Sequence, residues 1–361
     1  MAQRYDIAIV GAGMAGASLA AALGGRARVL LLEAEVRPGY HATGRSAAFW
    51  AESYGGPGVQ PLTTASGSWL QGHGFLAPRG ALTIARAGQE AAVEAFAARF
   101  AALGVRVEIL DRAAIAARVP GLRPGWTMAV FEPDCRDIDV AALHQHYLAA
   151  ARHAEAELWC SARLVGATAT ADGWRLRLGN GPEVACGLLV NAAGAWADAV
   201  AALAGARPIG IRPLRRTMVQ IRVAPAAPAE LPLVLDLSER FYFKPEAGRL
   251  WLSPHDETPS PACDAAPEEI DVATAIARLE EAVDWTVERV ERRWAGLRSF
   301  APDRLPVYGF DPVCPRFFWF AGQGGFGIQT APAAADLAAR LLLGEGAGAV
   351  DPAPYAPARF C

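Results

Sequence analysis

Residues 5–16 read YDIAIVGAGMAG, a short apolar run followed at once by glycines spaced as G-x-G-x-x-G. The apolar run Tyr5–Val10 predicts a buried strand, and the small residues of Ala17–Leu23 predict a helix. Arg28–Leu32 predicts a second buried strand, which ends at Glu33. Strand, glycine turn, helix, strand and terminal acid together predict a dinucleotide-binding βαβ unit.

Each residue of this motif has a physical role in holding a dinucleotide. Gly11 permits the tight turn, Gly13 lets a pyrophosphate approach the backbone, and Gly16 lets the helix pack closely on the strand. The start of the helix offers free N–H groups to the phosphates. Glu33 accepts hydrogen bonds from ribose hydroxyls and repels a 2′-phosphate, which disfavours NADP. FAD and NAD both remain, and the position of the motif at the start of a long chain favours FAD.

Size and composition limit the class of protein. The chain has 361 residues, enough for two domains or one large domain. Hydrophobic residues make up 53% and charged residues 20%, which excludes a disordered chain. Lys and Arg number 34 against 37 Asp and Glu, a net charge of -3. This balance argues against a nucleic-acid partner.

Targeting signals and metal sites are not expected. The N-terminal residues lack the pattern of a signal peptide, and no apolar run approaches the roughly 20 residues of a membrane span. None of the six cysteines forms a C-x-x-C pair, so we expect reduced thiols and a cytoplasmic location. His144 and His146 are two residues apart and do not share a helix face, so we expect no metal.

The rest of the chain alternates between strands and helices. Asp139 is the expected N-cap of a helix over Val140–His153, and short strands follow up to Asn191. Residues 209–300 are rich in strand patterns and contain one helix, predicted over Pro267–Ala282. Near the C-terminus, a second glycine loop at residues 322–327 lies between a strand and a helix, which is another geometry that can hold a ligand.

Five stretches resemble the D-amino-acid oxidase superfamily of FAD enzymes, which includes glycine oxidase, sarcosine oxidase and bacterial D-amino-acid dehydrogenases. The stretches are GAGMAG (11–16) with Glu33, PGYHATGRSAA (38–48), LVNAAGAWA (189–197), WAGLRSFAPDRLPVYG (294–309) and GQGGFGIQTAP (322–332). HATGRSAA, RFYFKPE (240–246) and WAGLRSF look most like the bacterial D-arginine dehydrogenase-type enzymes.

The resemblance implies an α/β fold of the glutathione-reductase-like, D-amino-acid oxidase type. A Rossmann-type FAD-binding domain would combine with a substrate domain that contains a large mixed or antiparallel sheet. We predict a discontinuous FAD-binding domain over residues 1–80, 140–206 and 300–361, and a substrate-binding domain over 81–139 and 207–299.

The resemblance also implies a noncovalent FAD and the residues that hold it. The pyrophosphate would lie at the first glycine turn, the ribose at Glu33, and the adenine against the strand of Val165. Residues 45–47 would lie beside the flavin, and backbone N–H groups of the second glycine loop would face its O2 edge. The predicted cofactor residues are Gly11, Gly13, Ala15, Gly16, Glu33, Ala34, Arg45, Ser46, Ala47, Val165, Ala193, Gly194, Trp196, Arg298, Gly325, Gly327, Ile328 and Gln329.

Four residues are implied at the reaction site. Arg298 would bind the substrate carboxylate, Tyr242 would support it, Arg216 would point at the same pocket, and Tyr54 would act as a lid. A hydride would move from Cα–H to flavin N5, and the imino acid would hydrolyse to a 2-oxo acid and ammonia. No catalytic acid or base is needed if the amine is neutral. The electron acceptor is left open between oxygen, a quinone and another carrier.

The substrate pocket is expected to be apolar. Ala81 stands where relatives that prefer cationic D-amino acids have an acid, and Phe49 and Trp50 follow the RSAA motif; Gln329 would complete the pocket. An unpaired cationic side chain would be costly there, so apolar or aromatic D-amino acids are favoured. If a basic substrate is preferred, Glu52 is the candidate counter-charge. The alternatives are a glycine or sarcosine-type amine oxidase and a flavin-binding subunit without turnover.

Overall fold

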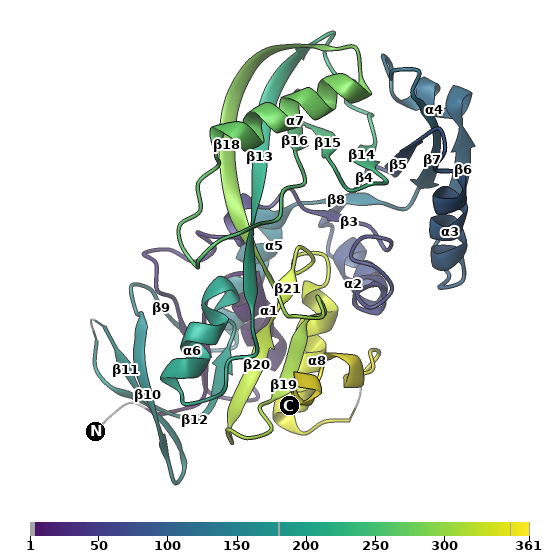
Figure 1. Cartoon of the computed structure of the whole chain (residues 1–361). Coiled ribbons are helices and arrows are strands. Elements are labelled where there is room, and N and C mark those ends of the chain that lie inside the picture. The colour runs from purple at the N-terminus through teal and green to yellow at the C-terminus, as the bar shows by residue number, and fades with distance from the viewer. Residues whose placement is uncertain (1–3, 180, 347, 361) are drawn as a thin grey trace.

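The computed structural model describes residues 4–179, 181–346 and 348–360. Its strands form two large sheets and one small sheet within these ranges. Figure 1 shows the first sheet in the lower half and the long strands β13 and β18 rising from it towards α7 at the top. The cofactor groove described below is lined by residues from both halves.

The first sheet is parallel at its centre, in the order β9-β2-β1-β12-β20. Its eight strands are β1 (Arg4–Val10), β2 (Val29–Leu32), β9 (Glu157–Trp159), β10 (Leu164–Thr170), β11 (Gly173–Leu178), β12 (Val184–Asn191), β19 (Val307–Phe310) and β20 (Phe317–Ala321). Parallel strands buried on both faces read as continuous apolar runs, which explains the run in β1 and the fully buried VLLL of β2.

Helices cover both faces of this sheet. One face packs against α1 (Met14–Leu23), α5 (Val140–His153) and α8 (Ala331–Leu343), and α2 (Gln60–Gly72) lies on α8. The other face packs against α6 (Ala197–Leu203). The antiparallel strands β10 and β11, which continue the sheet from β12, contribute side chains to the same core. The start of α1 and the carboxyl ends of β1 and β12 therefore meet at one edge, where open α/β sheets bind ligands.

The second sheet is mainly antiparallel and is built around β13 and β18, which pair along almost their full length. Its ten strands are β5 (Ala81–Arg86), β6 (Glu108–Asp111), β7 (Trp126–Glu132), β13 (Arg212–Ala224), β14 (Leu233–Asp236), β15 (Tyr242–Glu246), β16 (Arg249–Ser253), β17 (Thr258–Pro259), β18 (Thr286–Phe300) and β21 (Gln323–Gly324). One face packs against α7 (Glu269–Ala282) and α4 (Arg112–Arg118), while α3 (Glu90–Ala101) packs on β7.

A small sheet consists of β3 (Phe49–Trp50), β8 (Arg136–Ile138) and β4 (Leu76–Pro78). Its strands occur in the sequence where the chain passes from one large sheet to the other. The expected α/β fold, with a parallel cofactor-type sheet and a large mixed sheet, is confirmed. The helix predicted at 140–153 is also confirmed, since the Asp139 carboxylate accepts from the Ala142 N–H at 2.9 Å. The helix α2 and the strand β7 were not predicted from the sequence.

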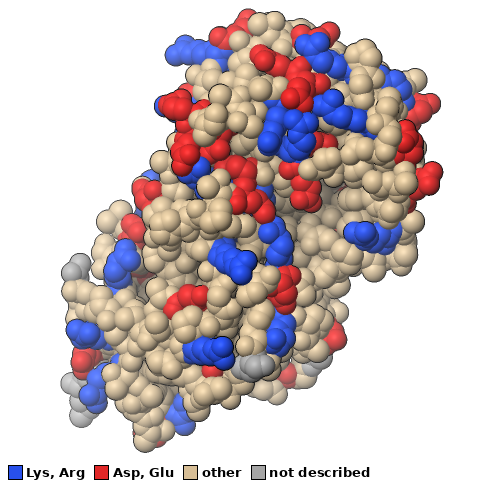
Figure 2. Space-filling model, in the orientation of Figure 1, with Lys and Arg blue, Asp and Glu red and all other residues tan. Residues whose placement is uncertain are grey.

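Acidic and basic side chains are mixed over the visible surface. On the face drawn in Figure 2, Lys and Arg lie close to Asp and Glu on both halves of the molecule. Surface ion pairs such as Arg26–Glu345 and Arg340–Asp336 are examples of this mixing. Within the described residues, none of the helices has the length and apolar character that a membrane crossing requires.

Candidate functional site: a cofactor groove that ends at two arginines

The first glycine turn leaves room for a ligand and almost none for side chains. Gly11 has φ +103°, and a Cβ on it would lie 2.5 Å from the carbonyl oxygen of Ala192. A Cβ on Gly16 would lie 1.8 Å from the Gly11 oxygen. Gly13 is the N-cap of α1 and supplies no side-chain cap. The first turn of α1 therefore faces the groove with backbone N–H groups, which suits a pyrophosphate.

Glu33 lies at the end of β2 as predicted, and it also holds the turn. Its Oε2 accepts from the Ala12 N–H at 3.0 Å, and its Oε1 accepts from the Glu35 N–H at 3.0 Å. A carboxylate oxygen has more than one acceptor position, so these bonds leave capacity for ribose hydroxyls. The residues present therefore fit a dinucleotide cofactor.

His144 supports the same turn from α5 and was missed in the sequence. Its Nε2 donates to the Ala12 carbonyl at 2.9 Å, and burial lowers its pKa, so the neutral ring is favoured. A Cβ on Gly39 would lie 2.8 Å from this ring. The His144–His146 spacing gave no signal of this role, because the contact depends on how α5 packs against α1.

Most of the predicted cofactor residues line one groove. Those that line it are Gly11, Gly13, Ala15, Glu33, Ala34, Arg45, Ser46, Ala47, Ala193, Gly194, Trp196, Arg298, Gly325, Gly327 and Ile328. Gly16 lies beneath the turn. Val165 is not among the residues that line the groove, whereas its neighbours 162–164 are. Residues that were not predicted also line it, among them His41, Thr43, Met218 and Gly296.

The groove ends among basic and aromatic side chains from β13, β15 and β18. Arg216, Tyr242 and Arg298 all line this end. Tyr242 alternates with the core residues Phe241 and Phe243, so its ring faces the groove, and its hydroxyl donates to the Met218 sulfur at 3.0 Å. A Cβ on Gly325 would lie 3.0 Å from the Arg298 guanidinium, so the second glycine loop contacts this arginine closely.

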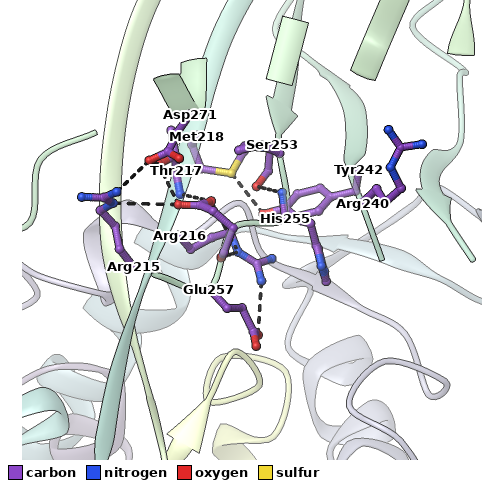
Figure 3. A network of polar contacts seen from close by, with 12 residues as sticks. Arg215, Arg216, Thr217, Met218, Arg240, Tyr242, Ser253, His255, Glu257 and Asp271 are labelled. Carbon is purple, nitrogen blue, oxygen red and sulfur yellow. Dashed lines mark hydrogen bonds and ion pairs between the residues drawn. The ribbon is translucent and has the colours of Figure 1, made fainter. Parts of the chain in front are cut away.

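Arg216 is buried but not fully paired. Its side chain is 4% exposed; Nε donates to the Asp256 carbonyl at 2.7 Å, and Nη2 lies 3.4 Å from Glu257 Oε1. Its Nη1 is buried without a hydrogen-bond partner in the described part of the chain. Figure 3 shows this guanidinium near Glu257 and turned away from Arg215. A buried donor without a partner is costly, so this end of the groove favours an anionic group.

Burial and neighbouring positive charges lower the pKa values of two basic groups at this end of the groove. Burial and the charge of Arg298 lower the pKa of Arg216, although a guanidinium stays protonated. Burial, together with Arg216 and Arg298, lowers the pKa of His255 to about 2, so this histidine is neutral. Arg215, the neighbour of Arg216 on β13, is paired with Glu268 and Asp271.

Tyr54 lies over Arg298, in the loop 51–56. Its ring centroid is 5.9 Å from the Arg298 guanidinium carbon, and the ring packs against Phe49 at 4.8 Å and Phe326 at 5.3 Å. Phe49 belongs to an apolar cluster with Ala81, Met218 and Tyr242. Met218 and Tyr242 line the groove, whereas Phe49 and Ala81 pack behind them and do not line it.

Two residues predicted in the substrate pocket lie elsewhere. Trp50 follows Phe49 on β3, so its side chain points to the opposite face, where its Nε1 donates to the Thr63 carbonyl. Gln329 is 2% exposed and is fully used by backbone and side-chain partners. Its Oε1 accepts from the Ala51 N–H, and its Nε2 donates to the Tyr54 carbonyl and to Thr63 Oγ1. Gln329 therefore holds the loop 51–56.

A buried acid lies beside Ala81, where the sequence showed none. Ala81 pairs with Glu132 across β5 and β7, so both side chains point to the same face. Glu132 is 3% exposed and accepts from the Glu52 N–H at 2.6 Å. Glu52 itself accepts from the Thr64 hydroxyl on α2. Only strand pairing reveals Glu132, which lies about 50 residues from Ala81 in the sequence.

The described cysteines are all free, and one of them lines the groove. Cys314 packs on the far side of the first sheet near Ala204 and does not line the groove. Cys263 is half-buried and does line it. The thiol to test for covalent attachment is therefore Cys263.

We expect acid precipitation of the purified holoprotein to leave the flavin in the supernatant, because the groove holds the cofactor by backbone donors and packing. The measurement is the absorbance of supernatant and pellet, with the Cys263→Ser variant treated alongside. Flavin that stays with the wild-type pellet but not with the variant pellet would contradict noncovalent binding.

Comparison with known proteins points in the same direction as this geometry. Glycine oxidase from Pseudomonas aeruginosa is 28% identical over 260 residues, which is 67% of this chain and 65% of that protein. Hydrogen cyanide synthase subunit HcnC from the same organism is 29% identical over 227 residues, 59% of this chain and 50% of that protein. The chain thus spans half or less of the first curated relatives that it matches.

Solved structures share the fold over nearly the whole chain. Glycine oxidase from Geobacillus kaustophilus superposes with a TM-score of 0.86 at 24% identity and covers 98% of both chains. L-proline dehydrogenase from P. horikoshii superposes with a TM-score of 0.88 at 20% identity, over 100% of this chain and 98% of that one. The family model for FAD dependent oxidoreductases (DAO) matches residues 6–341. The chain therefore belongs to the DAO family of FAD-dependent oxidoreductases.

Proposed function

We propose that this FAD-dependent oxidoreductase oxidises D-amino acids to 2-oxo acids and ammonia. The observation that carries the proposal is the end of the groove, where Arg298 and Arg216 face a single space beside Tyr242. One donor of Arg216 is buried there without a partner among the described residues. A substrate carboxylate would satisfy that donor and would place the adjoining Cα at the flavin end of the groove.

The side chains of this site would bind and orient the substrate. The planar fork of Arg298 suits bidentate binding of a carboxylate, and Arg216 Nη1 would add a charge-assisted hydrogen bond. Tyr54 and Phe49 would exclude water above the carboxylate. When bound, FAD supplies the acceptor for the hydride. The substrate amine must be neutral before a hydride can leave Cα. Because the pKa of His255 is lowered to about 2, this ring is neutral and would add no positive charge near the amine.

The test is anaerobic mixing of the holoenzyme with a panel of D- and L-amino acids, glycine and sarcosine, followed by flavin absorbance. Bleaching by D-amino acids alone supports the proposal. Bleaching by glycine or sarcosine alone would favour the amine-oxidase alternative, and no bleaching by any member would favour a subunit without turnover. Admission of air then separates an oxidase from a dehydrogenase that needs a quinone or another carrier.

Apolar or aromatic D-amino acids should have higher kcat/KM than D-Arg and D-Lys. Phe49, Ala81 and Met218 form an apolar wall behind the site, and apolar contact contributes about 25 cal/mol per Å², whereas an unpaired cation is costly to bury. Steady-state rates with D-Phe, D-Leu, D-Met, D-Arg and D-Lys measure this preference. A higher kcat/KM for D-Arg would contradict it and would make Glu132 or Glu52 the counter-charge.

Three further assignments accompany this function as proposals. RFYFKPE (240–246) and WAGLRSF resemble D-arginine dehydrogenase-type enzymes, which suggests that the activity of this protein is similar to theirs. The two large sheets suggest the domain division at residues 80, 139, 206 and 299, although β21 from the C-terminal segment pairs with β18. The free cysteines suggest a reducing, cytoplasmic location.

A further inference from the structure

The loop 51–56, which carries Tyr54, is held at several points. From the C-terminal segment, Gln329 bonds to the Ala51 N–H and the Tyr54 carbonyl. From α2, the Thr64 hydroxyl donates to Glu52. From the ten-stranded sheet, Glu132 at the end of β7 binds both the Glu52 N–H and the Ser53 hydroxyl. Of these partners, Gln329 is an amide and Thr64 is an alcohol, while Glu132 can change its charge.

Glu132 is held in short, well-buried contacts. Its carboxyl oxygens lie 2.6 Å from the Glu52 nitrogen and 2.5 Å from the Ser53 hydroxyl oxygen, and the residue is 3% exposed. On its other side is Ala81, which brings no charge. The titratable neighbours of Glu132 are Glu52 and the buried Cys135. The Lys244–Asp137 ion pair lies near that thiol. Among the described residues, the hydrogen-bond partners of Glu132 are the Ser53 hydroxyl and the backbone N–H groups of Glu52 and Ser53, and none of them is a cation.

We propose that Glu132 is a positioning residue that, in its neutral form, latches the loop 51–56 over the substrate end of the groove, and that its ionisation releases this loop. The neutral carboxyl group has one O–H donor and one carbonyl acceptor. In this neutral form the carbonyl oxygen accepts from the Glu52 N–H and the O–H donates to Ser53 Oγ, whereas the ionised carboxylate accepts from the Ser53 hydroxyl. The inference deepens the proposed function and rests on it, since Tyr54 lies on the released segment and over Arg298.

The direction of the pH effect follows from burial. Burial raises the pKa of Glu132 to about 7; the bonds from Ser53 and the Glu52 N–H oppose this rise, and the negative charge of Glu52 adds to it. When the loop opens, water reaches the carboxyl group and its pKa returns towards the ordinary value. The proton therefore favours the closed loop, whose advantage is full below the ordinary value and is lost as pH rises through about 7.

Glu132→Gln and Glu132→Ala separate charge from contact. The side-chain amide that Glu132→Gln introduces has the same shape as the neutral acid, and it can accept from the Glu52 N–H while donating to Ser53 Oγ. Glu132→Gln should therefore keep the loop closed at every pH. Glu132→Ala removes both bonds, so the loop should be open at every pH. Glu108→Gln on the exposed strand β6 is the matched control.

The experiment is hydrogen exchange of residues 51–56 in the FAD-bound protein, with protection factors corrected for the intrinsic pH dependence. Between pH 6 and 8 the wild type and Glu108→Gln should lose roughly tenfold in protection, as expected for a closed-state pKa near 7 and an ordinary one near 4.5. Glu132→Gln should lose none. Equal pH dependence in the wild type and Glu132→Gln, or unchanged protection in Glu132→Ala, would overturn the latch.

Enzyme kinetics supply a second readout that a purely structural role would not move. The ratio of kcat/KM for Glu132→Gln over wild type should rise across the same pH range, mainly through KM, because substrate amine ionisation is common to both proteins and cancels. Ser53→Ala keeps Glu132 but removes one of its bonds to the loop, so it should weaken the latch. This variant is the one to use if the Glu132 variants do not fold. Exchange is measured without substrate, so failure of the latch and failure of the proposed amino-acid oxidation are distinguishable.

Discussion

Arg298→Ala is expected to lower kcat/KM for amino-acid oxidation by roughly 10²–10³-fold, equivalent to about 3–4 kcal/mol. The guanidinium lies at the end of the groove with Tyr54 against it and Gly325 in contact. Its loss removes a charge-assisted pair with the substrate carboxylate and the fixed orientation of Cα. Arg298→Lys should recover only part of the rate, because an ammonium group lacks the planar fork. The measurement is the rate of flavin reduction against substrate concentration.

The matched control is Arg293→Ala, on the same strand β18 but exposed and paired with Glu269. This control should retain nearly wild-type kinetics and bound flavin. Arg298→Ala should also keep its flavin, which a simple unfolding effect would not allow. Near-wild-type kinetics in Arg298→Ala would remove this residue from the substrate site, and Arg216 would then be the arginine to test.

Gly16→Ala should produce protein that has lost most of its FAD. The new Cβ would lie 1.8 Å from the Gly11 carbonyl oxygen and 3.2 Å from a Leu31 methyl, so α1 and the glycine turn must move apart. Overpacking of this kind costs about 1–3 kcal/mol or more, which is roughly a 5- to 150-fold loss of affinity if it falls on the bound state. The flavin-to-protein absorbance ratio after purification measures the loss.

Gly72→Ala is the control for the change of a helical glycine to alanine. Gly72 ends α2, and a Cβ on it would meet no atom within 4 Å. This variant should keep full flavin content and a normal circular-dichroism spectrum. If Gly16→Ala binds FAD as tightly as Gly72→Ala does, the turn at residues 11–16 does not hold the cofactor in the way that its geometry indicates.

Predictions from the sequence were most accurate where neighbouring residues decide the structure. The βαβ unit depends on an apolar strand, a glycine turn and a helix within about 30 residues, and all of these are local signals. The helix of Val140–His153 was predicted to the residue because Asp139 marks its start. Tyr242 faces the groove while Phe241 and Phe243 face the core, because side chains alternate along a strand.

The same alternation explains one of the errors. Phe49 and Trp50 were assigned to one pocket as a pair, but adjacent residues on a strand face opposite sides, and only Phe49 lies near Tyr242. Gln329 was assigned to the pocket from its motif, whereas its amide is used by the loop 51–56 and Thr63. Motif position indicates where a residue lies along the chain, but not which partners its side chain finds.

Short stretches of sequence were enough to predict the cofactor class, the strand and helix around the first glycine turn, and that Arg298 and Tyr242 lie at the groove. The folded chain was needed to identify the acid and the histidine that support the site. Glu132 meets Glu52 and Ser53 through the pairing of β5 with β7, and His144 reaches Ala12 because α5 packs on α1. Such contacts join residues about 80 and 130 positions apart, and they depend on strand register and helix packing, for which no short stretch of sequence carries a signal.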